Sequence, residues 1–120
     1  MPDKKLYEMQ AEICSALSHP VRLHILDLLA EKEMTSADLL EILEIPKANL
    51  SQHLTVLKDA GILSGKKEGQ FQVLSLALPK IKVACQLVRG ILSDRLLQDE
   101  KNVALLKKNL QKVTKAGSKK

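Results

Sequence analysis

The sequence is poor in aromatic residues, and this shortage argues against two classes of protein. Tyr7 and Phe71 are the aromatic side chains present, Trp is missing, and the aromatic share is 2%. Modules that bind single-stranded nucleic acid stack the bases on aromatic platforms. All-β folds are also rich in aromatic and β-branched residues. We therefore expect neither a single-strand-binding module nor an all-β domain.

Long apolar runs are missing as well. No stretch approaches the ~18 consecutive apolar residues of a membrane-spanning helix, and the first ten residues lack the apolar centre of a signal peptide. We expect a cytoplasmic protein without a membrane partner. In that compartment the two cysteines, Cys14 and Cys85, are expected to be reduced thiols rather than a structural disulfide.

Patterns typical of catalysis are also lacking. The sequence has no Gly-rich phosphate loop, no Ser/His/Asp set in a recognisable context and no paired carboxylates beside a candidate base. We therefore expect that the protein is not an enzyme.

Positive charge is abundant, but its distribution matters more than its total. The net charge is +5, and residues 101–120 hold seven Lys and no acidic residue, which leaves −2 for the first 100 residues. A high isoelectric point is therefore no argument for DNA binding. A DNA-binding body would need a local basic patch.

The hydrophobic pattern predicts mainly helical structure with one small β-hairpin. Apolar spacing indicates helices over residues 6–17, from Pro20 to about residue 31, and over 36–43, 47–59 and 80–97. A period of two predicts short strands at 62–64 and 71–76, with 65–70 as a polar, glycine-containing loop. We expect one domain over residues 1–97 and a basic C-terminal extension over 98–120, either helical or flexible.

Several local signals place the helix ends. Pro20 suits the first turn of a helix, with Ser18 or His19 as its cap. Thr35 and Asp38 have the spacing of a capping box, and Gly61 stands where a left-handed helix stop is expected. Two short helices joined by a tight turn and followed by a hairpin predict a winged helix-turn-helix.

The helix over 47–59 carries the residues that point to DNA. Its outer side is expected to present small hydrogen-bonding side chains, which can reach base edges in the major groove. Lysines in the following hairpin suit contacts with the DNA backbone. The predicted DNA-binding residues are Lys47, Asn49, Ser51, Gln52, His53, Thr55, Lys66, Lys67 and Gln70. Residues 47–72 carry four Lys against Asp59 and Glu68, so two protomers are expected to be needed for firm binding.

Two stretches resemble the ArsR family of arsenical-resistance, metalloregulatory repressors. They are Ala16–Leu26 (ALSHPVRLHIL) and Leu50–Leu63 (LSQHLTVLKDAGIL), within a resemblance over about residues 6–96. The resemblance implies a homodimer formed by the first and last helices, which binds operator DNA as a repressor and releases it when an inducer arrives. It places the helix over 47–59 as the recognition helix and the hairpin as the wing. Arg22 matches the arginine of the family's His-Pro-x-Arg motif, and whether it supports the fold or contacts phosphate is left open.

The sequence departs from the family at both of its common metal sites. The place of the family's Cys-x-Cys pair is taken by Met34-Thr35-Ser36, and the last helix has no His and only Asp94 as an acid. His19, His24 and His53 are too scattered for a zinc site. We expect no metal site and no cofactor.

The two cysteines are the remaining candidates for a sensor. Cys14 and Cys85 fall on the two helices that the resemblance assigns to the dimer interface. There they could be oxidised, react with reactive sulfur species or bind arsenite. Packing as small core residues is the simpler and preferred interpretation.

A different function also fits the fold. A winged helix can bind protein rather than DNA, but such a module has no need of a polar helix surface and a basic wing. Both features are present here, and they favour a sequence-specific regulator of transcription.

Overall fold

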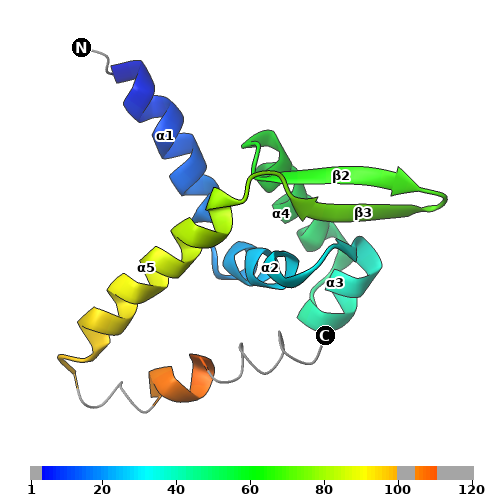
Figure 1. Ribbon diagram of the computed structural model, residues 1–120. Helices are drawn as coiled ribbons and strands as arrows, with labels where there is room; N and C mark the ends of the chain where they lie inside the picture. Colours follow the sequence, from blue (N-terminus) through cyan, green and yellow to red (C-terminus); the bar gives the residue numbers. More distant parts are fainter. Residues whose placement is uncertain (1–3, 100–104, 111–120) are drawn as a thin grey trace. The chain divides into compact units, whose positions relative to one another are not determined.

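The computed structural model describes residues 4–99 and 105–110, which belong to two compact units that divide between Pro79 and Lys80. The first unit combines helices with a small antiparallel sheet (Figure 1). Its elements are α1 Lys4–Leu17, α2 Pro20–Glu31, β1 Met34–Thr35, α3 Ser36–Leu43, α4 Lys47–Asp59, β2 Leu63–Glu68 and β3 Phe71–Leu76. The helices and the hairpin confirm the predicted winged helix-turn-helix.

Local hydrogen bonds explain where α2 and α3 begin. The His19 side chain caps α2, its Nδ1 accepting the Val21 N–H at 3.1 Å, and Pro20 occupies the first turn. Thr35 and Asp38 form the predicted capping box, in which each side chain accepts the other residue's backbone N–H at 3.1 Å. A threonine cap such as Thr35 stabilises a helix by about 1 kcal/mol.

The turn before α4 and the turn after it are both set by backbone geometry. Glu44 adopts the left-handed conformation at the end of α3, with φ 53°, and Pro46 then stands immediately before α4. Gly61 has φ 76° directly after the helix, as its position in the sequence predicts. The observed bounds of α4, Lys47–Asp59, are the predicted ones.

The core of the first unit lies between α2, α3, α4 and the sheet. Burial of one large apolar side chain in this core contributes roughly 1.5–3 kcal/mol to the free energy of unfolding. The largest fully buried side chains are Ile25, Leu26, Leu39, Leu50, Leu57 and Leu74. Because Leu50 and Leu57 belong to α4, the core fixes which side of that helix turns outward.

The sheet has one strand that the sequence does not predict. In the strand order β1-β3-β2, Met34 pairs with Leu74 and Thr35 pairs with Val73. Two residues are too few to show a period of two, and the sequence therefore gives no sign of β1. The strand forms because β3 offers it a free edge. It joins the start of α3 to the sheet.

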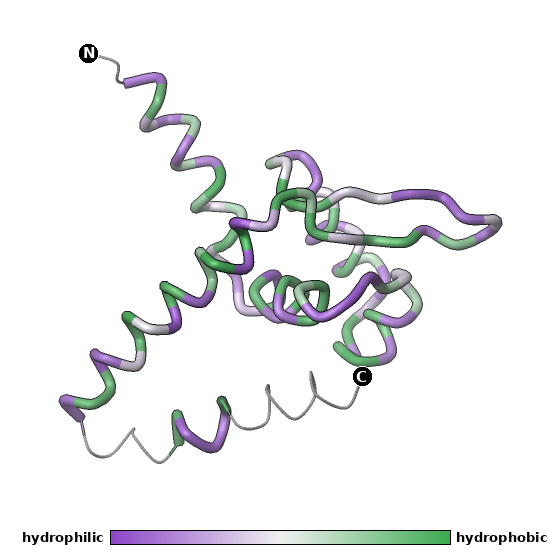
Figure 2. The backbone as a smooth tube through the Cα atoms, viewed as in Figure 1, coloured by the Kyte–Doolittle hydropathy of each residue, from purple (hydrophilic) through white to green (hydrophobic). Residues whose placement is uncertain are grey.

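The hairpin is longer than predicted, and the prediction of a loop over residues 65–70 was wrong. Strand β2 continues to Glu68, which pairs with Phe71, so the turn contains only Gly69 and Gln70. Gly69 has φ 64° at the first central position, as a type II′ turn requires. Lys66 and Lys67 are thus strand residues with defined faces. Figure 2 shows hydrophilic residues along the outer part of this hairpin.

The second unit contains α5, Lys80–Leu96, and a helical segment over residues 105–110. Ile81 is buried, but Leu87, Val88, Ile91 and Leu92 of α5 are exposed within the chain. The rest of the predicted basic extension, residues 100–104 and 111–120, lies outside the described residues, and the predicted domain boundary after residue 97 stays a prediction. In the described parts of the chain, no helix has both the length and the apolar character needed to cross a membrane.

Candidate nucleic-acid interface

Helix α4 has one buried side and one exposed side. Leu50, Leu54 and Leu57 are buried, and at 3.6 residues per turn they share one side of the helix. The opposite side and the first turn present polar residues to solvent. We call these the recognition face: Lys47, Asn49, Ser51, Gln52 and Thr55, all of them exposed. The structure therefore brings together five of the predicted DNA-binding residues.

The chemistry of the recognition face suits contacts with duplex DNA. The amides of Asn49 and Gln52 can each pair with adenine through two hydrogen bonds. Pro46 cannot supply a capping side-chain oxygen, and the Asn49 N–H donates to the Pro46 carbonyl at 3.0 Å. The two amides before Asn49 are therefore the ones that suit an anion such as phosphate. The Thr55 hydroxyl donates to the Ser51 carbonyl at 2.9 Å, so towards a ligand it acts as an acceptor.

His53, a further predicted DNA-binding residue, is placed differently. It is only partly exposed, its Nδ1 lies 3.2 Å from an Nη1 of Arg22, and its ring centroid is 4.4 Å from that of His19. Burial, followed by the positive potential of His19 and of Arg22, lowers the pKa of His53 below its ordinary value. Its neighbours on the protein side of the helix thus favour the neutral form of the ring.

The register of the wing separates its two lysines. Lys67 pairs with Gln72 on the face that carries the buried Leu74, which is the face turned towards the helices. Lys66 pairs with Val73 on the opposite face, and its Nζ lies 4.0 Å from a carboxylate oxygen of the exposed Glu68. Of the two cations, Lys67 shares its side of the hairpin with α4.

Gly65 of the hairpin and Lys58 of α4 lie close together on this side of the wing, and the sequence did not single them out. A Cβ built on Gly65 would lie 2.8 Å from Nε2 of Gln72 and 3.2 Å from Cε of Lys58. The missing side chain at Gly65 thus leaves room for the Lys58 side chain of α4 to lie against the hairpin. An isolated glycine in a strand signals such a close approach, but the predicted loop over 65–70 hid that signal.

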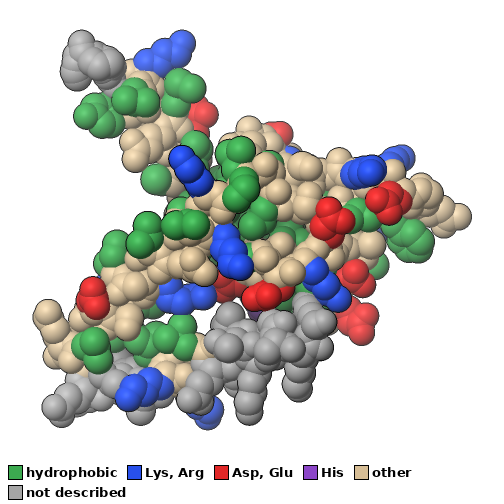
Figure 3. Space-filling model, viewed as in Figure 1, with side chains coloured by type: hydrophobic (Ala, Val, Ile, Leu, Met, Phe, Trp, Pro, Cys, Tyr) green, Lys and Arg blue, Asp and Glu red, His purple; other side chains and the backbone are tan. Residues whose placement is uncertain are grey.

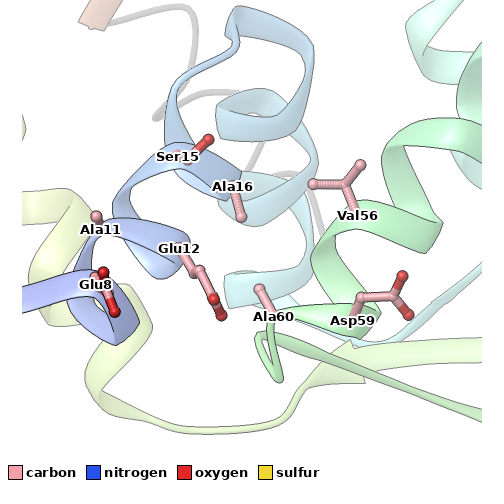
Figure 4. A pocket seen from close by; sticks show the side chains of 8 residues that line it. All are labelled: Glu8, Ala11, Glu12, Ser15, Ala16, Val56, Asp59 and Ala60. Carbon is pink, nitrogen blue, oxygen red and sulfur yellow. The ribbon is translucent and has the colours of Figure 1, made fainter. Parts of the chain in front are cut away.

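The C-terminal half of α4 borders a groove of a different character (Figure 4). This groove of about 570 Å³ lies against α1 and is lined by Glu8, Ala11, Glu12, Ser15, Ala16, Val56, Asp59 and Ala60. Its three carboxylates repel phosphate. The surface of α4 that suits DNA is therefore its first two turns, where the recognition face lies.

The two cysteines occur one in each compact unit. Cys14 is exposed on α1, so it is not a core residue of its own unit, whereas Cys85 is half-buried on α5. Among the described residues, no three His, Cys, Asp or Glu side chains lie close enough to hold a metal ion.

Comparisons with known proteins agree with this architecture. A family model described as a helix-turn-helix domain matches residues 17–65. An HTH-type transcriptional regulator of Mycobacterium tuberculosis is 36% identical over 100 residues, covering 79% of this chain and 88% of the relative. Its crystal structure superposes with a TM-score of 0.71 at 35% identity, over 79% of this chain and 95% of that one.

The 36% identical relative shows a helix-turn-helix transcriptional regulator, and a second solved structure adds the name of the family. The homodimeric winged helix-turn-helix DNA-binding domain of a possible ArsR-family regulator from Mycobacterium bovis has a TM-score of 0.73 at 26% identity, covering 79% of this chain and 88% of that one. The chain belongs to the ArsR family of winged helix-turn-helix transcriptional regulators. A further relative, the transcriptional repressor SdpR of Bacillus subtilis, is 42% identical over 64 residues, 53% of this chain and 71% of the relative. In this ArsR-family chain, α4 stands at the position of the recognition helix and the β2–β3 hairpin at that of the wing.

Proposed function

We propose that this ArsR-family protein binds operator DNA as a homodimer and represses transcription. The recognition face of α4 enters the major groove, and Lys67 of the wing holds the flanking phosphates. The observation that carries this proposal is the orientation of α4. Its leucines are anchored in the core, and its amides and hydroxyls are presented to solvent on the opposite side. The protein would act in the compartment that holds its operator, which we take to be the cytoplasm.

Exposed apolar side chains support the homodimer. Leu6, Tyr7, Met9 and Ile13 are exposed on α1, as are the apolar residues of α5 named above, and Figure 3 shows hydrophobic side chains along both helices. Apolar surface of this extent usually marks an interface. The solved Mycobacterium bovis relative is homodimeric. A two-fold dimer would contact two operator half-sites about one helical turn of DNA apart.

The test is a binding titration. A duplex selected by the wild-type protein from a random pool, and a scrambled version of it, are titrated at two salt concentrations. We expect the selected duplex to bind more tightly and both affinities to fall with salt, because phosphate contacts release counterions. A flat salt response would support the protein-interaction module instead.

The position of the recognition face is tested with Gln52→Ala and Asn49→Ala. Each variant should lose about 1–3 kcal/mol of discrimination against a wrong base, at the operator position that its amide contacts. The scrambled duplex is the control, because its binding by either variant should change little. If discrimination stays intact in both variants, the DNA-contacting surface lies elsewhere.

The second candidate concerns the inducer. The exposure of Cys14 favours a reactive thiol over core packing at that position. We propose that oxidant, reactive sulfur species or arsenite acting on Cys14 and Cys85 weakens operator binding. Operator affinity is measured before and after each reagent, with Cys14→Ser and Cys85→Ser as controls. An affinity that no reagent changes would reject the thiol switch.

A further inference from the structure

The guanidinium of Arg22 connects three helices of the first unit. Its Nε donates to the Ala16 carbonyl at 2.6 Å and its Nη2 donates to the Ser15 carbonyl at 3.3 Å. Its Nη1 lies 3.2 Å from Nδ1 of His53. Arg22 itself belongs to α2, the two carbonyls to the last turn of α1, and His53 to α4. One side chain thus joins the end of α1 to the middle of the recognition helix.

We infer that Arg22 is a positioning residue for DNA recognition, which holds α4 at a fixed angle to α1 by bonding His53 and the last carbonyls of α1 together. The inference rests on the proposed function, because it concerns how the recognition face is oriented. The sequence leaves open whether Arg22 supports the fold or contacts phosphate. The inference favours support of the fold, because the guanidinium is turned to protein atoms.

The chemistry of the site requires an arginine. The last carbonyls of a helix have no partner within the helix, although that of Ser15 also accepts the N–H and the hydroxyl of Ser18. A planar guanidinium with five N–H donors can serve two such carbonyls and an imidazole at the same time. A lysine ammonium is a compact charge on a flexible stem, and it cannot reach acceptors in such a fork. Arg22→Lys therefore keeps the charge and removes the geometry.

His53 is fixed from its other side as well. Its ring packs at 52° to that of His19, whose own orientation is set by the bond from the Val21 N–H. To accept the Arg22 N–H at Nδ1, His53 must be neutral with its proton on Nε2. The lowered pKa of His53 favours this neutral form. The charged and titratable groups facing His53 are His19, which precedes α2, and Arg22 on α2 itself.

The arrangement has a consequence for regulation. In the proposed homodimer α1 contributes to the dimer interface, and His53 is the immediate neighbour of Gln52 on the recognition face. A change in the position of α1 would be transmitted to α4 through the three contacts of one planar guanidinium. Dimer geometry and operator affinity would then be coupled through Arg22.

A double-mutant cycle tests the inference. Operator affinity is measured for Arg22→Lys, His53→Ala and the double variant, each at a temperature well below its measured unfolding midpoint. We expect each single variant to lose about tenfold in affinity and the double variant to lose little more, because both remove the same connection. The salt dependence should stay that of the wild type, since no phosphate contact is lost. His24→Ala, which removes an exposed histidine of α2, is the matched control and should bind as the wild type does.

A second measurement needs no DNA. The His53 ring is titrated by NMR in the wild type and in Arg22→Gln, and its pKa should rise in the variant because a nearby positive charge and part of the burial are lost. An unchanged pKa would show that the contact does not form in solution, and this would overturn the inference.

The DNA experiment can overturn it in two further ways. Wild-type affinity in Arg22→Lys, or losses that multiply in the double variant, would show that the connection does not orient α4. A salt slope about 1 smaller per protomer in Arg22→Gln would make Arg22 a phosphate contact instead. If the wild type bound no duplex at all, the proposed function itself would fail, which is a distinct result.

Discussion

The recognition helix α4 and the outer half of the wing serve the same proposed function, but different forces hold them in place. Helix α4 is anchored by three leucines in the core and by the contact between His53 and Arg22. The outer wing, Lys66–Phe71, is exposed on both faces and depends on cross-strand pairing and on the turn at Gly69. Figure 1 shows the hairpin extending beyond α3 and α4 of the same unit. Burial therefore specifies α4, whereas backbone geometry specifies the wing.

The largest expected difference between the two regions is in the free energy of unfolding that is lost when one apolar residue is replaced by alanine. Leu57 is fully buried, and Leu57→Ala should lower the free energy of unfolding by about 2–5 kcal/mol. Phe71 is 59% exposed, and Phe71→Ala should cost less than about 1 kcal/mol despite the larger side chain. Urea unfolding measures both. Equal losses would mean that the wing is packed against something in solution.

The two wing lysines sharpen the comparison within the hairpin. Lys67→Gln should weaken binding to all duplexes by about fivefold and reduce the salt slope by about 1 per protomer, because one phosphate contact is lost. Lys66→Gln should have little effect, since Lys66 lies on the other face beside Glu68. Titrations at several salt concentrations separate the two. The reverse order of effects would place the DNA on the other side of the wing.

Acid should destabilise the protein through His53 of α4, whereas the wing contains no histidine. Because the folded state lowers the pKa of His53 below the unfolded value of about 6.5, the unfolded state binds the proton more readily. The contribution of His53 to stability is thus fully present above that value and is lost as the pH falls through it towards the folded pKa. Thermal unfolding between pH 7.5 and 5, a range chosen to bracket the ordinary histidine pKa of about 6.5, should show this loss. His53→Gln should reduce the loss and the His24→Gln control should preserve it.

The glycines of the wing give the smallest expected effects. Gly69→Ala should destabilise the protein by about 1 kcal/mol, because an alanine at φ 64° is strained. At Gly65 the crowded atoms are the ends of two flexible side chains, so Gly65→Ala should change stability by less than about 0.5 kcal/mol while displacing Lys58. Urea unfolding compares the two variants. A larger loss of stability in Gly65→Ala would show that the packing of the Lys58 side chain against Gly65 stabilises the protein.

The sequence predicts the buried half of the molecule better than the exposed half. Leu50, Leu54 and Leu57 recur at the helical period, and they fix the bounds of α4 and the recognition face together. In the outer wing neither face is buried, so no alternation marks Gly65 to Glu68 as a strand. The sequence also suggests His53 as a DNA contact, from its place in the first two turns of the helix and from the family resemblance, whereas the structure places it beside Arg22 and His19.

Local information in the sequence was sufficient for the helices, their caps and the polar side of α4, because each depends on residues within one or two turns of each other. Only tertiary structure decided the pairing of Met34 with Leu74, the side of the hairpin that carries Lys67 and the contact of Arg22 with His53. These depend on contacts between residues about 30 or more positions apart or on strand register. A contact at such a separation forms only when the whole core has brought its two ends together.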